Sequence, residues 1–102
     1  MMAPDRSSES EGGQFPSHES LELLRASLSR FLTTGEEDAV CESLDVLARE
    51  AHERKLYAER MLVALKRVWA EMAEVQAMPS EKERKRLLDR VVRLCIDAYY
   101  AR

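Results

Sequence analysis

The chain has 102 residues, which is enough for one domain with a hydrophobic core and too few for two. Only three glycines and three prolines occur among many leucines, alanines, glutamates and arginines, a composition typical of helices that argues against sheet-based classes. No apolar run approaches the roughly 20 residues needed to cross a bilayer, and no signal-peptide block is evident, so we expect a cytoplasmic protein with no membrane contact.

The net charge of −3 is unevenly distributed along the chain. Residues 1–53 contain twelve acidic side chains and four arginines, whereas residues 54–102 contain twelve basic and seven acidic side chains. Such asymmetry indicates either two halves that pack with complementary rims or one half that offers a charged face to a partner. We favour the first interpretation, because charged flanks are the usual solvated faces of compact helical bundles.

Residues 1–16 are rich in Ser, Glu, Gly and Pro and have no apolar period. Such a segment cannot bury enough surface to offset its ordering entropy. We therefore predict a disordered tail over residues 1–16, followed by a single helical domain over residues 17–102. Within the tail, only Phe15 is expected to pack locally on the first helix.

Two helices are predicted in the first half of the domain. Ser17 is a suitable N-cap for a helix over residues 18–33. Thr34 and Glu37 have capping-box spacing for the next helix, over residues 36–53. Large apolar side chains recur in both at three- and four-residue steps, which indicates one apolar face on each helix.

The densest apolar pattern lies at residues 61–75 and predicts a third helix over residues 57–77. No glycine or proline interrupts residues 36–77, so one continuous helix is allowed. We favour a short break near residues 53–57, because the sequence there is polar and a helix of about 40 residues would far exceed the mean of about 11–12.

Pro79 ends the third helix, and Ser80 with Glu83 forms a capping box that opens a fourth helix over residues 81–101. This last helix also has a wide apolar face. Short links between amphipathic helices imply antiparallel neighbours. The expected fold is therefore an all-α, small antiparallel four-helix bundle.

Patterns for catalysis or metal binding are lacking in the sequence. His18 and His52 have no Cys, Asp or Glu partner at metal-ligand spacing and are interpreted as surface residues. Cys41 and Cys95 lie far apart within helical patterns and are interpreted as small buried hydrophobic residues in a reducing compartment. With no nucleophile elbow and no phosphate-binding loop, we expect no catalytic residue, cofactor, metal or enzymatic activity.

The apolar faces of the third and fourth helices are wider than one small bundle readily covers, so some of this surface is expected to contact a partner. The candidate interface residues are Leu62, Trp69, Met72, Leu88, Val92 and Tyr99. The first expected partner is a second copy of the chain, in a homodimer, or else another protein.

Positive charge is concentrated where the fourth helix begins. The candidate anion or nucleic-acid contacts are Lys82, Arg84, Lys85 and Arg86. Acidic residues interleave with them and the chain is acidic overall, so a solvated helix face is the favoured interpretation. We therefore predict a non-enzymatic protein-interaction or regulatory module that self-associates, with a nucleic-acid-associated regulator as the alternative.

Overall fold

The computed structural model describes residues 15–101, and this part of the chain is helical with no strand. The helices are α2 (His18–Thr34), α3 (Asp38–Glu53), α4 (Ala58–Glu71), α5 (Ala73–Gln76) and α6 (Glu81–Tyr100). The all-α class is confirmed. Among the described residues, no helix is both long enough and apolar enough to cross a membrane.

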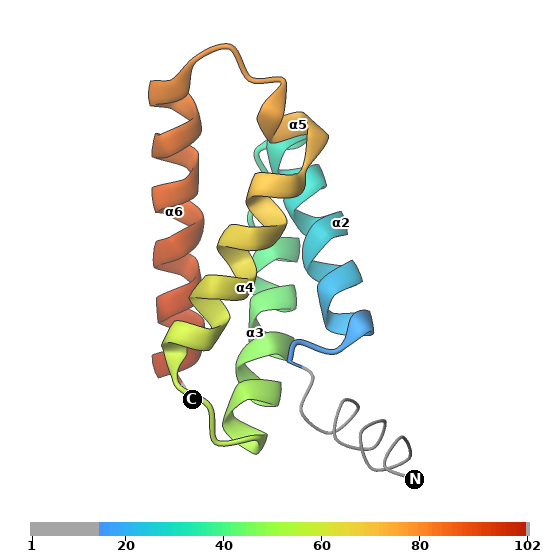
Figure 1. Ribbon diagram of the computed structural model, residues 1–102, viewed down its shortest axis with the longest axis vertical. Coiled ribbons are helices and arrows are strands. Elements are labelled where there is room, and N and C mark those ends of the chain that lie inside the picture. Colours follow the sequence, from blue (N-terminus) through green and yellow to red (C-terminus); the bar gives the residue numbers. More distant parts are fainter. Residues whose placement is uncertain (1–14, 102) are drawn as a thin grey trace, which may run out of the picture.

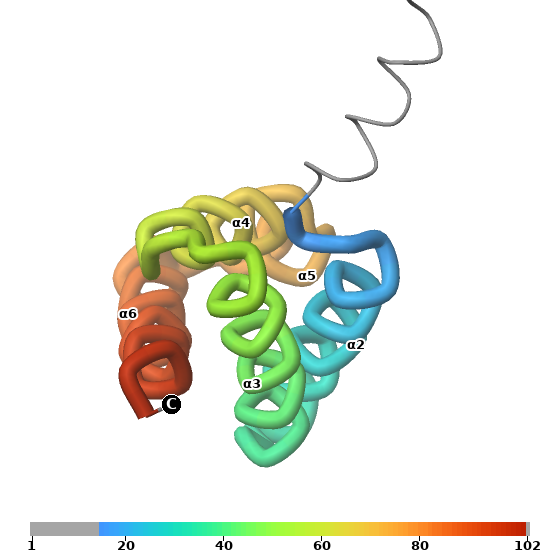
Figure 2. Tube along the Cα trace, turned by 90° about the horizontal axis from the view of Figure 1, so that it is seen from below, coloured from blue at the N-terminus to red at the C-terminus, as the bar shows by residue number. Residues whose placement is uncertain are grey.

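The long helices α2, α3 and α6 form a layer in which α3 lies in the middle, and α4 covers one side of that layer (Figure 1 and Figure 2). Successive long helices run in opposite directions. α4 is oblique to the others: it begins beside the C-terminal end of α6 and leans toward α2 at its own C-terminal end (Figure 1). This oblique path makes the arrangement less regular than the expected bundle.

The hydrophobic core lies between α4 and the three-helix layer. Its largest fully buried side chains are Leu24, Leu28, Val40, Leu44, Leu47, Met61, Leu65, Val91 and Cys95. Of the four long helices, α6 has the fewest buried residues, Val91 and Cys95, against five each in α2 and α4 and six in α3, although it is the longest of the described helices with 20 residues. α6 therefore depends on its partly buried flanks for much of its attachment.

Phe15 packs on the helical domain, as expected for this one residue of the tail, and Pro16, which was also assigned to the tail, packs there too. Pro16 is buried, and Phe15 lies against the core cluster. Both line a hollow with Leu21 of α2 and Val68 of α4. The packed part of the chain thus begins before residue 17, and residues 1–14 of the predicted tail lie outside the described residues.

The start of α2 follows the sequence signal, and the start of α3 does not. Ser17 caps α2 as predicted, since its hydroxyl accepts a hydrogen bond from the Ser20 amide at 3.3 Å. The capping box predicted for α3 does not form, because Thr34 stays in α2 and donates to a carbonyl one turn back. The Glu37 carboxylate instead binds Arg90 of α6 through two hydrogen bonds of 2.8 and 2.7 Å.

α3 and α4 are separate helices, so the predicted break is confirmed. α3 ends in a Schellman motif, in which the Lys55 amide donates to the His52 carbonyl at 3.1 Å and the Leu56 amide to the Ala51 carbonyl at 2.8 Å. Lys55 has a φ of 60°, in the left-handed region that costs a residue with a Cβ about 1–2 kcal/mol. The position usually taken by glycine is therefore occupied by lysine.

We expect Lys55→Gly to raise the free energy of unfolding by about 1 kcal/mol, because glycine adopts this backbone conformation without the Cβ clash. Urea denaturation followed by circular dichroism measures the effect. Lys55→Ala is the matched control, since it removes the charge and keeps the Cβ. An equal gain in both variants would assign the effect to the lost charge and contradict the prediction.

The predicted third helix is interrupted at Met72, which separates α4 from the single turn of α5. Met72 has a ψ of 131°, which is extended backbone, while its side chain stays buried at 4% exposure. The Gln76 side chain donates to the Ala70 carbonyl at 2.9 Å, and so satisfies an acceptor that the break leaves without its helical partner. The start of α6 agrees with the prediction, since the Ser80 hydroxyl accepts from the Glu83 amide at 3.1 Å.

Candidate interaction surface

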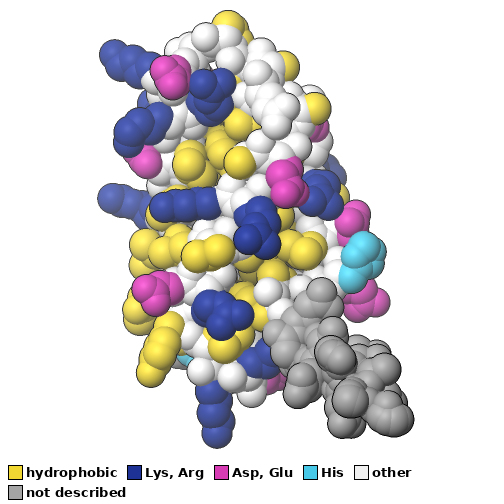
Figure 3. All heavy atoms as spheres, in the orientation of Figure 1, with side chains coloured by type: hydrophobic (Ala, Val, Ile, Leu, Met, Phe, Trp, Pro, Cys, Tyr) yellow, Lys and Arg dark blue, Asp and Glu magenta, His cyan; other side chains and the backbone are white. Residues whose placement is uncertain are grey.

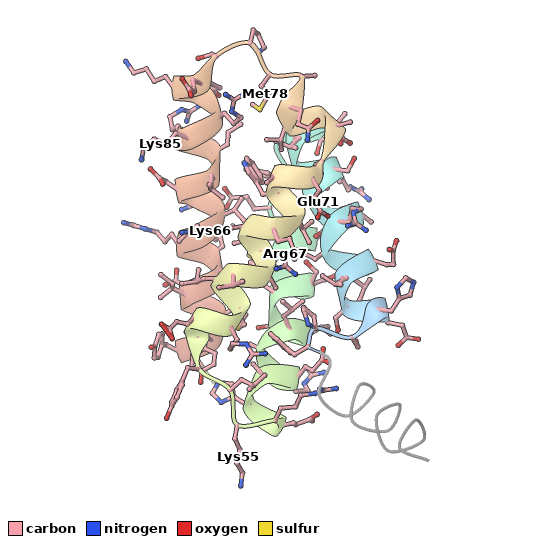
Figure 4. The ribbon with its side chains drawn as sticks, in the orientation of Figure 1. Lys55, Lys66, Arg67, Glu71, Met78 and Lys85 are labelled. Atoms are coloured by element: carbon pink, nitrogen blue, oxygen red, sulfur yellow. The ribbon has the colours of Figure 1, made fainter. Side chains whose placement is uncertain are left out.

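A groove separates the C-terminal end of α4 and α5 from the N-terminal half of α6. Polar contacts hold the α4–α5 wall against α2: Arg25 lies 3.7 Å from the Glu71 carboxylate, and the Ser29 hydroxyl donates to Glu74 at 2.5 Å. Figure 4 shows Glu71 on the side of α4 that faces α2. Because α4 leans toward α2 while α6 packs on α3, the two walls diverge toward this end of the molecule (Figure 1).

The groove has a volume of about 690 Å³. Its lining residues are Trp69, Ala70, Val75, Gln76, Glu81, Lys82, Arg84, Lys85 and Leu88. The apolar members come from α4, α5 and the inner side of α6, whereas the three cations all come from the first turns of α6. Figure 3 shows hydrophobic side chains in this seam, bordered by Lys and Arg side chains.

Two of the rim cations, Arg84 and Lys85, take part in weak interactions that solvent can reach. Arg84 donates to a loop carbonyl at 3.2 Å and lies 3.9 Å from Glu81, whose side chain is 90% exposed. Lys85 lies 3.5 Å from Asp89, and both side chains are largely exposed. Exposed pairs of this kind contribute about 0–1 kcal/mol, so an incoming anion can compete for these cations.

Arg86 is the candidate that the structure separates from the other three. Its guanidinium binds the Glu83 carboxylate at 2.6 Å and lines a different hollow, on the α3 side of α6, with Leu87 and Arg90. The predicted basic cluster is therefore a groove rim of three cations, Lys82, Arg84 and Lys85, with Arg86 facing elsewhere.

The six candidate interface residues fall into two groups. Trp69 and Met72 are each 4% exposed and belong to the core, although Trp69 also lines the groove. Because the chain itself buries these two side chains, they have almost no apolar surface left for a dimer contact. The others are partly buried beside the core, and they are Leu62, Leu88, Val92 and Tyr99.

Three apolar side chains on α6 form an outward line that we term the α6 apolar row: Val92, Ile96 and Tyr100. They follow one another at four-residue steps, which places them on one side of the helix. Val92 is partly buried, Ile96 is 37% exposed and Tyr100 is 71% exposed. Ile96 and Tyr100 were not among the predicted interface residues, although their spacing from Val92 was visible in the sequence.

Tyr99 fastens the C-terminal end of α6 to the link between α3 and α4. Its hydroxyl donates to the Leu56 carbonyl at 2.7 Å, and its ring stacks on His52 with 4.3 Å between centroids. The Nε2 atom of His52 also lies 3.0 Å from the Tyr99 carbonyl oxygen. His52 is exposed as predicted, and Tyr99 uses both its ring and its hydroxyl within the chain.

Neither cysteine has the environment of a reactive thiol. Cys95 is buried as predicted, and burial raises the pKa of its thiol to about 12. Cys41 was predicted to be buried but is exposed on the outer side of α3; partial desolvation, followed by the charge of Glu37, raises the pKa of its thiol. A raised pKa leaves less thiolate, which is the nucleophile and the metal ligand.

The other charged contacts are structural. Hydrogen bonds from Arg90 lower the pKa of the Glu37 carboxyl, and a hydrogen bond from Ser29 lowers that of Glu74. Within residues 15–101, no group of three or more His, Cys, Asp or Glu side chains is placed to hold a metal ion.

No protein-family model, curated protein or solved structure matches this chain. The surfaces of the described residues that are suited to binding are the groove and the α6 apolar row.

Proposed function

We propose that this chain is a non-enzymatic, cytoplasmic protein-interaction or regulatory module of the antiparallel four-helix-bundle class, and that it forms a homodimer through α6. The observation that carries this proposal is the α6 apolar row. Ile96 and Tyr100 are exposed to solvent on the long helix that has the fewest buried residues.

Burial of the row against a second copy supplies the driving force. Apolar surface contributes about 25 cal/mol for each Å² removed from water, so an interface of a few hundred Å² per chain offsets part of the cost of association. A row on one helix pairs most simply with the same row on a second copy across a two-fold axis. This predicts a dimer that depends on protein concentration.

The polar groups of the domain support binding in preference to catalysis. Catalytic sites bring polar groups together in a concave, apolar pocket. Here the ionisable side chains lie at the groove rim in exposed pairs. The buried hydroxyls of Ser27 and Ser43 are bound to each other at 2.8 Å, and none of the buried side-chain N or O atoms in the described residues lacks a hydrogen-bond partner.

We expect the purified chain to self-associate at high micromolar concentration in sedimentation equilibrium, and Ile96→Glu or Tyr100→Glu to be monomeric. A carboxylate in the row would have to be desolvated in the dimer. Val63→Glu is the matched control, because Val63 is 57% exposed on α4 and lines the hollow on the α2 side. A wild-type chain that stays monomeric, or equal dissociation by the control, would contradict dimerisation through α6.

A nucleic-acid-associated regulator is the alternative function. It is supported by the gathering of Lys82, Arg84 and Lys85 at one end of α6. It is weakened by Glu81 and Asp89, which pair with two of these cations, and by the orientation of Arg86 toward a different hollow.

A further inference from the structure

We infer that the groove between α4–α5 and α6 binds an acidic amphipathic helix of a partner protein. This inference rests on the proposed class of interaction module, but it uses a surface other than the α6 apolar row and does not depend on dimerisation. The groove therefore gives the module a second contact, with a partner of defined chemistry.

The floor of the groove is suited to the apolar face of a helix. Trp69 and Val75 are 4% and 3% exposed and lie behind one wall, whose accessible apolar surface belongs to Ala70, while the partly buried Leu88 forms part of the other wall. A helix laid in an apolar groove anchors itself through side chains at i, i+3, i+4 and i+7.

The charge of the rim selects the partner. The lining contains three cations, Lys82, Arg84 and Lys85, and one acid, Glu81. All three cations lie on α6, whereas the opposite wall contributes the uncharged Ala70 and Gln76. A bound helix therefore meets positive charge along one flank, and the N-terminal end of the α6 macrodipole adds to it. Carboxylates on that flank are favoured and cations are opposed.

The apolar floor favours a polypeptide over a nucleic acid. Phosphate backbones are bound by cations, and the affinity comes from released counterions and needs no apolar surface. Here the cations lie beside an apolar lining whose accessible part belongs to Ala70 and Leu88, and a phosphate backbone would leave that part in water. An amphipathic helix covers the apolar floor and meets the rim at the same time.

The test uses two designed helical peptides that share leucines at i, i+3, i+4 and i+7 and differ only in their flanks, which are glutamate in one and lysine in the other. Trp69 is the only tryptophan of the chain and lines the groove, so its emission reports occupancy directly. We expect the acidic peptide to shift the emission and to bind at least about tenfold more tightly than the lysine peptide.

Charge reversal on the rim tests the assignment of the site. The Lys82→Glu and Lys85→Glu double variant should weaken the acidic peptide by about tenfold or more and strengthen the lysine peptide. Arg86→Glu is the matched control, on the same helix but lining the other hollow, and should change either affinity by less than about twofold. All three sites are exposed, and far-UV circular dichroism checks the fold.

Three outcomes would overturn the inference: equal binding of the two peptides, no emission shift with either, or binding of a mixed-sequence oligonucleotide that is lost at high salt and in the double variant. The last outcome, salt-sensitive binding of the oligonucleotide, would support the alternative function.

The monomeric Ile96→Glu variant separates this inference from self-association, because its groove is intact. Peptide binding by that variant supports the groove site, whether or not the wild-type chain forms dimers.

Discussion

Trp69→Ala is expected to lower the free energy of unfolding by about 3–5 kcal/mol, the usual range for truncation of a buried aromatic side chain. The indole is 4% exposed and belongs to the core cluster. It also lies in the seam where α4 faces α6, and α6 has only two buried residues, the fewest of the four long helices. The cavity left by truncation would therefore weaken the least supported helix as well as the core.

Urea denaturation followed by circular dichroism at 222 nm, a wavelength that reports about equally on all helices, measures this loss. Val63→Ala is the matched control, since Val63 lies on the same helix with 57% exposure, and it should cost less than about 0.5 kcal/mol. An unchanged midpoint for Trp69→Ala would mean that the indole is exposed in solution and acts as a contact residue.

Helix ends with a local signal were predictable from the sequence. Ser17 and Ser80 accept the capping hydrogen bonds expected of them, and Gly35 ends α2 with a φ of 81°. The break near Lys55 was predicted from the polar sequence there and from the helix length, whereas the break at Met72 was not predicted, and neither residue is a glycine or a proline. The Schellman motif and the extended residue are selected by the packing of the segments on either side, which local propensity does not contain.

The residues of the groove were predictable, and the groove was not. Trp69 and Leu88 were selected as apolar contacts and Lys82 and Lys85 as anion contacts, and the structure places all four in one lining. These residues come together because α4 leans toward α2. Contacts between residues more than 40 positions apart, such as that between Ser29 and Glu74, help to hold α4 in this orientation. No periodicity within a single helix carries that information.

The sequence interpretation centred the apolar face of α6 on Leu88, Val91 or Val92, Cys95 and Tyr99, and the structure buries Val91 and Cys95 of that line. Ile96 was counted in the same wide face, but the structure leaves it in solvent with Tyr100. Helical periodicity identifies an apolar face, but the direction in which that face is buried is set by the neighbouring helices. Here α6 is turned so that Val91 and Cys95 face the core.

The Glu50 carboxylate links the start of α2 to the last turns of α3, and Glu50→Ala is expected to lower the free energy of unfolding by about 2–3 kcal/mol. It accepts hydrogen bonds from the Ser17 amide at 3.0 Å and from the Ser20 hydroxyl at 2.9 Å, and lies 3.5 Å from Arg54. The side chain is only 15% exposed. Truncation would leave partly buried donors without their acceptor, which costs more than the loss of an exposed ion pair.

Glu53→Ala is the matched control, because Glu53 is an exposed glutamate in the same last turns of α3. It should cost less than about 0.5 kcal/mol, and an equal loss in the two variants would contradict the bridging role of Glu50.

Amide hydrogen exchange shows where in the chain the stability is lost. In Glu50→Ala, protection should fall most in the first turn of α2, where the Ser17 cap and the Glu50 carboxylate act together, and least in the middle of α6. A uniform fall across α2 and α6 would instead mean that Glu50 supports the whole domain and that its two serine contacts are not where the stability is gained.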